Sequence, residues 1–336
     1  MSLPPHRPRT AALLLALICC GCGPNPGSSV ANPSSLANDP APAANQRPQI
    51  WTTFEGARAL AHAQAQVDCG PRPAGSPALE TARGLILDSL KSSGWKAERQ
   101  EFEQDTPHGK IRMANIVATF PAAQSAPAAS PPPNRSRALV CSHYDTKKFS
   151  TISFLGANDG ASSTGALLEL ARVLAQNPPL AAKVDLVFFD GEEAMVQFTE
   201  SDGLYGSRHF ASALRASGRA PQYAFGIVLD MIGDRNLTIT LPFDSPKELT
   251  RGLLESARTL GVRDKFSLLD RSLLDDHVPL NEIARIPTVD VIDFDYNAWH
   301  TADDTMAQLS AQSLETIGSV TLHYLSNALA AQPPAK

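Results

Sequence analysis

The chain contains little cysteine. Its 336 residues include five cysteines, and only two of them, Cys69 and Cys141, lie beyond residue 22. Two thiols exclude a dense disulfide framework and a zinc site built from several cysteines. They leave two alternatives open, a single disulfide bridge or two separate buried thiols.

An excess of positive charge is also missing. The formal net charge is -5, and no run of Lys or Arg is interleaved with aromatic residues. A nucleic-acid-binding surface needs such a basic stripe, so nucleic acid is not expected as a partner. The composition is otherwise that of an ordinary globular protein, with 43% hydrophobic and 19% charged residues. This is enough apolar material for a sizeable core.

The apolar run near the N-terminus is too short to span a bilayer. It covers residues 11–18, follows two arginines and precedes a cluster of small residues and cysteines, which is typical of an export signal. The cluster resembles a bacterial lipobox, in which Cys22, or alternatively Cys20, becomes the lipidated first residue. Residues 1–22 are therefore predicted to be a lipoprotein-type signal peptide. The protein is expected to be exported to the bacterial cell envelope or periplasm and to be attached to the membrane through this lipid alone. The alternative is a cleaved signal whose cysteines carry no lipid.

Two segments are rich in Pro, Ala and Ser. Residues 23–48 cannot bury enough apolar surface to offset the entropy of ordering, and they are predicted to be a disordered tether. Residues 121–137 have a similar composition but separate two strand-like runs, 111–120 and 138–143, that are expected to be neighbours in a sheet. They are predicted to be a loop insertion within one domain that covers residues 49–333.

Helical and strand patterns alternate along this domain. Nearly continuous apolar runs predict buried strands at residues 138–141, 184–189, 225–229 and 288–292. Helical spacing predicts helices over residues 81–93, 165–174 and 314–329, the last with Ser310 as its N-cap. The alternation predicts an α/β fold, with one central mixed, mostly parallel, twisted sheet flanked by helices.

Chemically active side chains follow the predicted strands. His143 and Asp145 come after the first, Glu192 and Glu193 after the second, and Asp230 closes the third. Open α/β sheets bind ligands beyond the carboxyl ends of their strands, so we expect these side chains to converge.

Catalytic zinc takes about three protein ligands from His, Asp and Glu and keeps one position open. Candidate ligands occur in five motifs, which are SHYD, GANDG, FFDGEEA, LDMIGD and WHTADD. Each motif also has a plain structural interpretation. Asp159 precedes a helix and suits a cap, the pair Glu192 and Glu193 suits a solvated turn, and His300 suits a half-buried imidazole.

Taken together and in order, these motifs resemble the zinc-dependent M28 metallopeptidase-like family, and within it the glutaminyl-peptide cyclotransferases (glutaminyl cyclases). The resemblance extends from GPRPAGSP to the last helix, and it is carried by SHYDTKKF, FFDGEEA, DGLYGSRHF, DDHVPL and WHTADD. It implies a zinc aminopeptidase-like fold and a zinc-dependent catalytic domain.

The resemblance also implies roles for particular residues. The zinc ligands are Asp159, Glu193 and His300. Glu192 is the general acid/base, and the acidic partners near the substrate amine are Asp230 and Asp275. Trp299 and Phe198 contact the substrate. Phe198 stands where well-studied cyclases carry a tryptophan, which keeps an aromatic wall without an indole nitrogen and bears on substrate affinity.

The implied reaction closes the N-terminal Gln of a peptide or protein into pyroglutamate and releases ammonia. One zinc ion and a monomeric enzyme are expected. The alternative is an M28-type aminopeptidase that hydrolyses N-terminal residues with two zinc ions, because His143 and Asp230 match a second metal site that Asp159 would bridge. A surface lipoprotein that keeps the fold only for binding would be expected to lack ligands, and none is missing.

Other polar residues near these motifs have structural interpretations. Lys147 and Lys148 are predicted to be solvated. Tyr205 with Arg208 is predicted to fix the loop behind the glutamates, and Asp303 with Asp304 to order the turn after His300. Asp145 either orients His143 or simply ends a strand.

Overall fold

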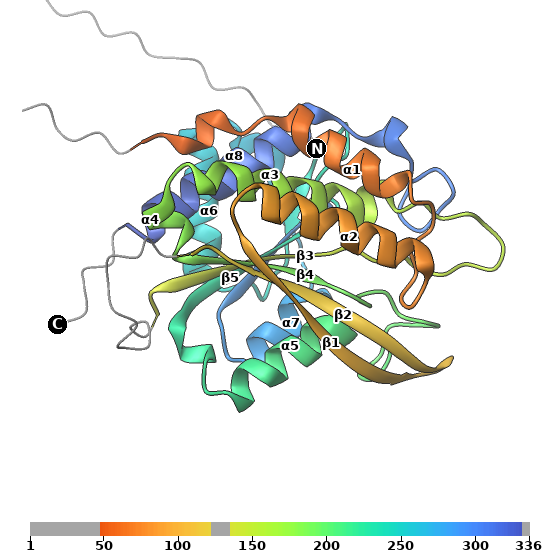
Figure 1. Ribbon diagram of the computed structural model, residues 1–336. Helices are drawn as coiled ribbons and strands as arrows, with labels where there is room; N and C mark the ends of the chain where they lie inside the picture. Colours follow the sequence, from red (N-terminus) through yellow and green to blue (C-terminus); the bar gives the residue numbers. More distant parts are fainter. Residues whose placement is uncertain (1–47, 122–134, 331–336) are drawn as a thin grey trace, which may run out of the picture. The chain divides into compact units, whose positions relative to one another are not determined.

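A six-stranded mixed sheet runs through the centre of the protein (Figure 1). The computed structural model describes residues 48–121 and 135–330. The strand order is β1-β2-β4-β3-β5-β8. Strands β3, β4, β5 and β8 run parallel to one another, and β2 runs antiparallel to both of its neighbours, β1 and β4. The strands are β1 (Lys96–Thr106), β2 (Gly109–Thr119), β3 (Arg137–His143), β4 (Val184–Phe189), β5 (Tyr223–Asp230) and β8 (Thr288–Ile292). The predicted fold class is confirmed.

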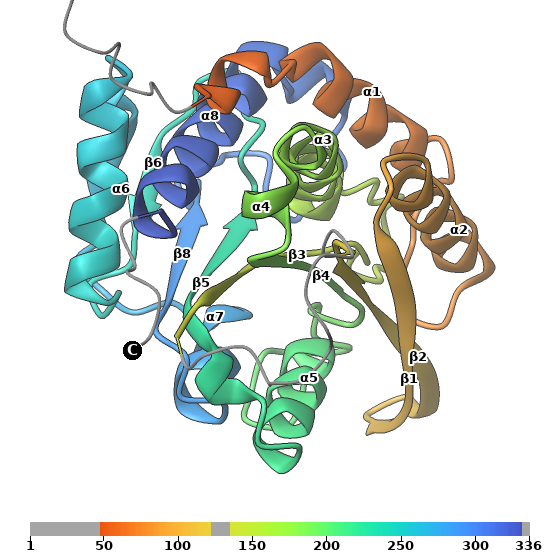
Figure 2. The ribbon, with the colours of Figure 1, turned by 60° about the vertical axis from the view of Figure 1, so that its left-hand side comes forward.

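Helices cover both faces of the sheet, as Figure 2 shows. One face carries α1 (Gly56–Val67), α2 (Pro77–Ser92), α3 (Ser163–Ala175), α4 (Pro178–Ala181), α6 (Lys247–Thr259) and α8 (Ala311–Ala328). The other face carries α5 (Tyr205–Ala216) and α7 (His277–Glu282). A separate parallel pair is formed by β6 (Ile239–Leu241) and β7 (Phe266–Leu268). Short 3-10 turns lie at Ile50–Thr53, Ala220–Gln222, Arg263–Lys265 and Met306–Gln308.

The central strands are buried on both faces because their apolar runs are continuous. Along β3, Val140 packs in the core on the α3 side, whereas its neighbour Leu139 packs against α5. Successive strand residues point to opposite faces, so a run of apolar residues fills both helical layers at once.

Side-chain caps fix the start of two helices. Ser310 Oγ accepts a hydrogen bond from the backbone N–H of Gln312 at 3.2 Å, which confirms it as the N-cap of α8. Helix α2 begins at Pro77, four residues before the predicted start, because Ser76 caps it with a 3.1 Å bond from Leu79 N and Pro77 suits the first helical position.

Two features of the sheet differ from the prediction. Strand β1 has no apolar run, since Phe102 is its one buried residue. The runs before and after the predicted loop insertion share the sheet but are not neighbours, because β4 pairs with both β2 and β3 and lies between them. The crossover from β3 through α3 brings β4 to that position, because two parallel strands such as β3 and β4 cannot be joined by a hairpin.

Several predicted segments lie outside the described residues. They are the signal peptide with Cys20 and Cys22, the tether as far as residue 47, and residues 122–134 of the loop insertion. Cys69 and Cys141 are free thiols, and Cys141 is buried within β3, so the separate-thiol alternative is the one observed. Among residues 48–121 and 135–330, none of the helices is long and apolar enough to cross a membrane.

Candidate active site

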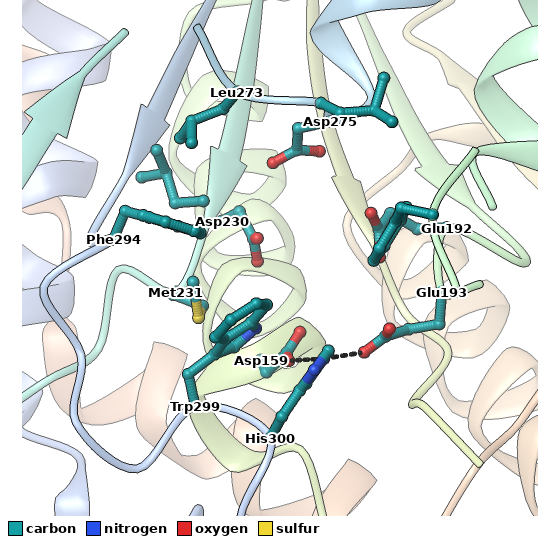
Figure 3. Close-up of a pocket in the computed structure, with 13 residues that line it drawn as sticks. Asp159, Glu192, Glu193, Asp230, Met231, Leu273, Asp275, Phe294, Trp299 and His300 are labelled. Atoms are coloured by element: carbon teal, nitrogen blue, oxygen red, sulfur yellow. Dashed lines mark hydrogen bonds and ion pairs between the residues drawn. The ribbon is translucent and has the colours of Figure 1, made fainter. Parts of the chain in front are cut away.

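A pocket of about 180 Å³ lies beyond the carboxyl ends of β4, β5 and β8. In Figure 3 the carboxylates of Glu192 and Glu193 enter it from one side, and Phe294 and Trp299 lie opposite. Its lining residues are Asp159, Glu192, Glu193, Phe198, Asp230, Met231, Leu273, Leu274, Asp275, Ile292, Phe294, Trp299 and His300. The structure therefore brings together every predicted catalytic, substrate-binding and primary metal residue.

Three of these residues form one group of potential metal ligands. Donor atoms of Asp159, Glu193 and His300 all lie within 4.8 Å of one another. His300 Nε2 is 3.1 Å from Glu193 Oε1 and 3.4 Å from Asp159 Oδ2, and Figure 3 shows both contacts. The group matches the predicted ligand set.

A second group shares Asp159 with the first. It consists of His143, Asp159 and Asp230. His143 Nε2 lies 3.2 Å from Asp159 Oδ1 and 3.2 Å from Asp230 Oδ1. The two oxygens of Asp159 thus face different histidines, which is the arrangement that a bridging ligand needs.

The donor set suits a divalent metal ion. Asp159 Oδ2 and Glu193 Oε2 are buried and accept no hydrogen bond among the described residues. Their neighbouring cationic groups are His300 Nε2 at 3.4 Å and Lys147 Nζ at 3.6 Å. Buried carboxylate oxygens are costly unless they are paired or coordinate a metal. Two carboxylates and one imidazole are ligands that zinc uses in catalytic sites. The residues present therefore fit the group that the sequence predicted.

The electrostatics of the site favour positive charge. Burial alone would lower the pKa of His300, but its contacts with Asp159 and Glu193 raise that pKa to about 9. Burial likewise opposes charging of His143, yet Asp230, Asp145 and Asp159 raise its pKa well above the ordinary value. The carboxylates thus concentrate negative potential where the donor atoms converge.

A distorted turn before α3 presents Asp159. Residues Ala157–Ser162 leave helical geometry at Asp159 and at Gly160, whose φ is 92°. A Cβ at Gly160 would lie 2.8 Å from the Asp145 carbonyl oxygen, so glycine is required there. The Asp304 carboxylate holds the turn, since it accepts hydrogen bonds from Asn158 N at 2.8 Å and Asp159 N at 3.1 Å. Asp304 therefore orders the turn that carries Asp159, whereas the prediction placed its ordering role in the turn after His300.

Asp145 fixes the two glutamates. Its Oδ1 accepts from Glu192 N at 3.1 Å, and its Oδ2 accepts from Glu193 N at 3.3 Å. Oδ1 also lies 3.5 Å from His143 Nδ1. Of the two alternatives for Asp145, the structure therefore supports the orienting role, and it extends that role to the glutamate pair.

Non-glycine residues adopt left-handed backbone conformations around the pocket. His300 has φ 55°, Met231 has φ 47°, and Leu204, the N-cap residue of α5 behind the glutamates, has φ 54°. Such conformations cost free energy and persist where packing holds them in place, often at functional sites. Here they direct the His300 ring and the turn after Asp230.

Glu192 has the electrostatics of a proton carrier. Burial raises its pKa well above the ordinary value, and the charges of Glu193 and Asp275 raise it further, against the opposing effect of His143. Asp275 is also perturbed, because burial and the charge of Asp230 raise its pKa to about 6. A carboxyl with a raised pKa can both accept and return a proton near neutral pH.

The loop behind the glutamates is fixed as predicted. The Asp202 carboxylate accepts from Met195 N at 2.7 Å and from Val196 N at 2.9 Å. Tyr205 Oη donates to Asp202 at 2.7 Å, and Arg208 donates to the Thr199 carbonyl oxygen at 2.8 Å.

The prediction for Lys147 is wrong, whereas Lys148 is exposed as predicted. The side chain of Lys147 is 12% exposed, and its Nζ lies 3.6 Å from Glu193 Oε2. It donates to the Ala194 carbonyl oxygen at 2.8 Å and lies 5.4 Å from the centre of the Phe198 ring. A lysine two residues after Asp145 carries no sequence signal that separates this position from a solvated one.

The apolar part of the pocket wall was also missed. Leu273, Leu274 and Phe294 line the pocket without any chemical signature of their own. Their one cue is position, since the two leucines immediately precede Asp275 in the sequence.

Comparison with known proteins agrees with this geometry. The sequence profile of peptidase family M28 matches residues 115–325. The chain belongs to peptidase family M28. This M28 member is 30% identical over 287 residues to the glutaminyl-peptide cyclotransferase-like protein of Bos taurus, with 77% of this chain and 72% of the relative covered.

Solved structures of similar proteins share the fold of this M28 member. The glutaminyl cyclase of an Acidobacteriales bacterium has a TM-score of 0.74 and 29% identity, with 88% of this chain and 99% of that chain covered. A Zn-dependent exopeptidase from Parabacteroides distasonis has a TM-score of 0.71 and 27% identity, with 82% and 98% covered. The fold thus occurs both in proteins named cyclases and in one named an exopeptidase.

Proposed function

We propose that this M28 family protein is a glutaminyl-peptide cyclotransferase that converts the N-terminal Gln of peptides and proteins to pyroglutamate. The observation that carries this is a small pocket in which Glu192, a carboxyl with a raised pKa, lies beside the ligand group of Asp159, Glu193 and His300. The names of the similar cyclases support the choice of reaction.

In the proposed reaction, the α-amine of the Gln attacks its own side-chain amide carbon. A carbon–nitrogen bond forms and closes a five-membered ring, and the bond to the amide nitrogen breaks. Glu192 accepts a proton from the amine and returns one to the departing nitrogen, which leaves as ammonia. Asp159, Glu193 and His300 would hold a zinc ion, which when bound would supply Lewis-acid polarisation of the side-chain carbonyl.

The other pocket residues position the substrate. Asp230 and Asp275 line the same pocket as Glu192, and their carboxylates would hydrogen-bond the amine and order proton transfer. Trp299 and Phe198 close the pocket around the Gln side chain and limit access of water. Because nucleophile and electrophile belong to one residue, holding a bent conformer supplies much of the rate enhancement.

The experiment that tests this function compares two dipeptides. Purified protein is incubated with a Gln-primed and a Leu-primed dipeptide, and ammonia and free amino acid are both measured. We expect ammonia and pyroglutamate from the first and no reaction with the second. Release of leucine without formation of pyroglutamate would show that the function is peptide hydrolysis.

A zinc aminopeptidase is the second candidate. The group of His143, Asp159 and Asp230 favours it, because it offers a second metal site that Asp159 would bridge, and the similarity to a Zn-dependent exopeptidase supports it. Metal content measured by mass spectrometry separates the two candidates. One zinc per chain is expected for the cyclase, and two per chain would support the peptidase.

The cellular setting is part of the proposal. The protein is exported, is anchored to the membrane of the bacterial envelope through a lipid on Cys22, or alternatively Cys20, and acts as a monomer. The basic, apolar and cysteine-containing N-terminal sequence supports the export and the lipid anchor. Mass spectrometry of the mature N-terminus, with Cys22→Ser as the comparison, tests the lipid site, and light scattering of the purified protein tests the monomer.

A further inference from the structure

Arg83 on α2 is a charged residue that the protein buries. Helix α2 packs against β1 and β2, as Figure 2 shows. The side chain of Arg83 is 9% exposed, and it is not among the residues that line the active-site pocket. A guanidinium is seldom taken out of water unless other groups replace its hydrogen bonds. The partners of Arg83 therefore indicate what the buried charge does.

The Arg83 guanidinium contacts two segments that carry active-site residues. Its Nη2 donates to Asp190 Oδ2 at 2.6 Å, and its Nε donates to Tyr144 Oη at 2.7 Å. Asp190 follows β4 and begins the turn that carries the two glutamates of the pocket. Tyr144 follows β3 and lies between His143 and Asp145. One rigid, planar group thus joins the chain segments that leave β3 and β4.

A third strand completes this network. Tyr144 Oη donates to the Ala114 carbonyl oxygen at 2.5 Å, and Asp190 Oδ2 accepts from Ala114 N at 2.8 Å. Ala114 belongs to β2, which pairs with β4. Tyr144 and Asp190 are both fully buried, so no solvent is at hand to replace the guanidinium as a donor.

The turn of the two glutamates is therefore held from two sides. Asp145 accepts from the backbone N–H groups of Glu192 and Glu193 on one side, and Arg83 holds Asp190 on the other. Catalysis is sensitive to such supports, since a misplacement of about 1 Å can cost about 10²-fold in rate.

We propose that Arg83 is a positioning residue for the reaction, whose planar guanidinium fixes the turn of Glu192 and Glu193 through Asp190 and Tyr144. The inference rests on the proposed cyclase function. Arg83 acts only through these two partners, because it does not line the pocket that holds the substrate. A lysine is a poor replacement, since its ammonium is a point charge without the fixed fork of donors.

Arg83 can be reached from the surface. It lines a cavity of about 370 Å³, together with Arg99, Arg112 and Met113 of β1 and β2. Removal of its side chain would extend this cavity inward towards the two buried partners. A free guanidinium ion could then enter and offer the same planar set of donors to the same acceptors.

Chemical rescue tests the proposal. In Arg83→Ala, kcat for a Gln-primed dipeptide should fall about 10- to 100-fold with little change in KM, because the turn shifts while the substrate contacts remain. Guanidinium chloride, at concentrations far below those that unfold the protein, should restore kcat several-fold, and sodium chloride should not. Zinc is kept in excess and its content is measured, so that loss of metal is not mistaken for loss of positioning.

Two further variants complete the test. Arg251→Ala is the matched control, because Arg251 also pairs with a glutamate three residues earlier, as Arg83 does with Glu80, but both partners of that pair are exposed. It should keep kcat. Arg83→Lys retains the charge beside Asp190 and serves if Arg83→Ala does not fold. Its kcat should fall several-fold at unchanged KM.

A purely structural role predicts a different result. Guanidinium weakens folded proteins, so a gain in kcat confined to Arg83→Ala cannot come from added stability. A natural kcat in Arg83→Lys, or no recovery of folded Arg83→Ala with guanidinium, would overturn the positioning role and leave the cyclase function standing. Absence of ammonia with the natural protein would overturn the cyclase function, and the positioning role with it.

Discussion

Glu192 and Glu193 are chain neighbours with different surroundings. Asp145 holds the backbone N–H groups of both, so their side chains leave a fixed segment in defined directions. Glu193 approaches His300, whereas Glu192 has a pKa raised by burial and by Glu193 itself. One fixed turn can thus present a metal ligand and a proton carrier side by side.

This difference predicts separate effects of mutation. Glu192→Gln should keep the metal and lower kcat by about 10²- to 10⁴-fold, which is the usual contribution of a positioned general base. Zinc content and kcat are measured on the same preparation. An unchanged kcat would contradict the assignment of Glu192 as the proton carrier.

The matched variants remove ligands. Glu193→Gln and His300→Ala should lose both zinc and turnover, because each removes one of three converging donors. A variant of either kind that binds zinc as tightly as the natural protein would show that its residue is not a ligand.

Asp190 gives a prediction on pH. It is fully buried, and its Oδ2 accepts from Arg83 at 2.6 Å and from Ala114 N at 2.8 Å. Burial, with the charge of Asp145, raises its pKa to about 7 despite Arg83. A raised pKa means that proton binding favours the folded state, so this stabilisation is complete below about pH 4 and is lost as pH rises through about 7.

Asp190→Asn removes this titration. The free energy of unfolding of the natural protein relative to the variant should therefore fall by about 1 to 3 kcal/mol between pH 4 and pH 8. Urea unfolding of both proteins across that range measures it. A difference that does not change with pH would contradict the pKa of Asp190.

At the scale of elements, α1 and α3 approach closely at a glycine. A Cβ on Gly165 would lie 2.4 Å from the Ala59 carbonyl oxygen and 2.9 Å from Ala63 N. Gly165→Ala should lower the free energy of unfolding by about 1 to 3 kcal/mol, because the helices must separate.

Gly84 is the matched control, on α2. A Cβ there would meet no atom within 4 Å, and the position is helical. Gly84→Ala should raise the free energy of unfolding by about 0.5 to 1 kcal/mol through the entropy of the unfolded chain. Denaturant unfolding of the two variants should give opposite signs, and equal signs would contradict the close approach.

The elements also show what a sequence can predict. Strands β4 and β8 match their predicted bounds because burial on both faces leaves a continuous apolar run. The position of β4 between β2 and β3 was not predictable, since strand pairing depends on contacts between distant segments. The site residues differ in the same way. Asp159 and His300 could be predicted because their side chains are metal-ligand types within recognisable motifs, whereas nothing in the sequence marks Leu274 as a pocket residue.

At the scale of the whole molecule, the pocket collects five carboxyl groups. They belong to Asp159, Glu192, Glu193, Asp230 and Asp275. A bound cation offsets their mutual repulsion and binds only the folded chain, so metal binding and stability are linked.

Removal of metal should therefore destabilise the protein. We expect dialysis against a chelator to lower Tm by about 10 °C, and zinc to restore it. Calorimetry with and without zinc measures this, and metal analysis verifies removal. Identical Tm values for the metal-free and zinc-loaded protein would contradict a metal site in this pocket.

Strand β1, which has no apolar pattern, ends one side of the sheet. No strand of the described residues pairs with its outer edge, and its eleven residues include Lys96, Glu98, Arg99, Glu101 and Glu103. A free edge invites another chain to add a strand, and charged side chains oppose this. The charged residues that leave β1 without an apolar strand pattern therefore also protect the folded protein from edge-to-edge aggregation.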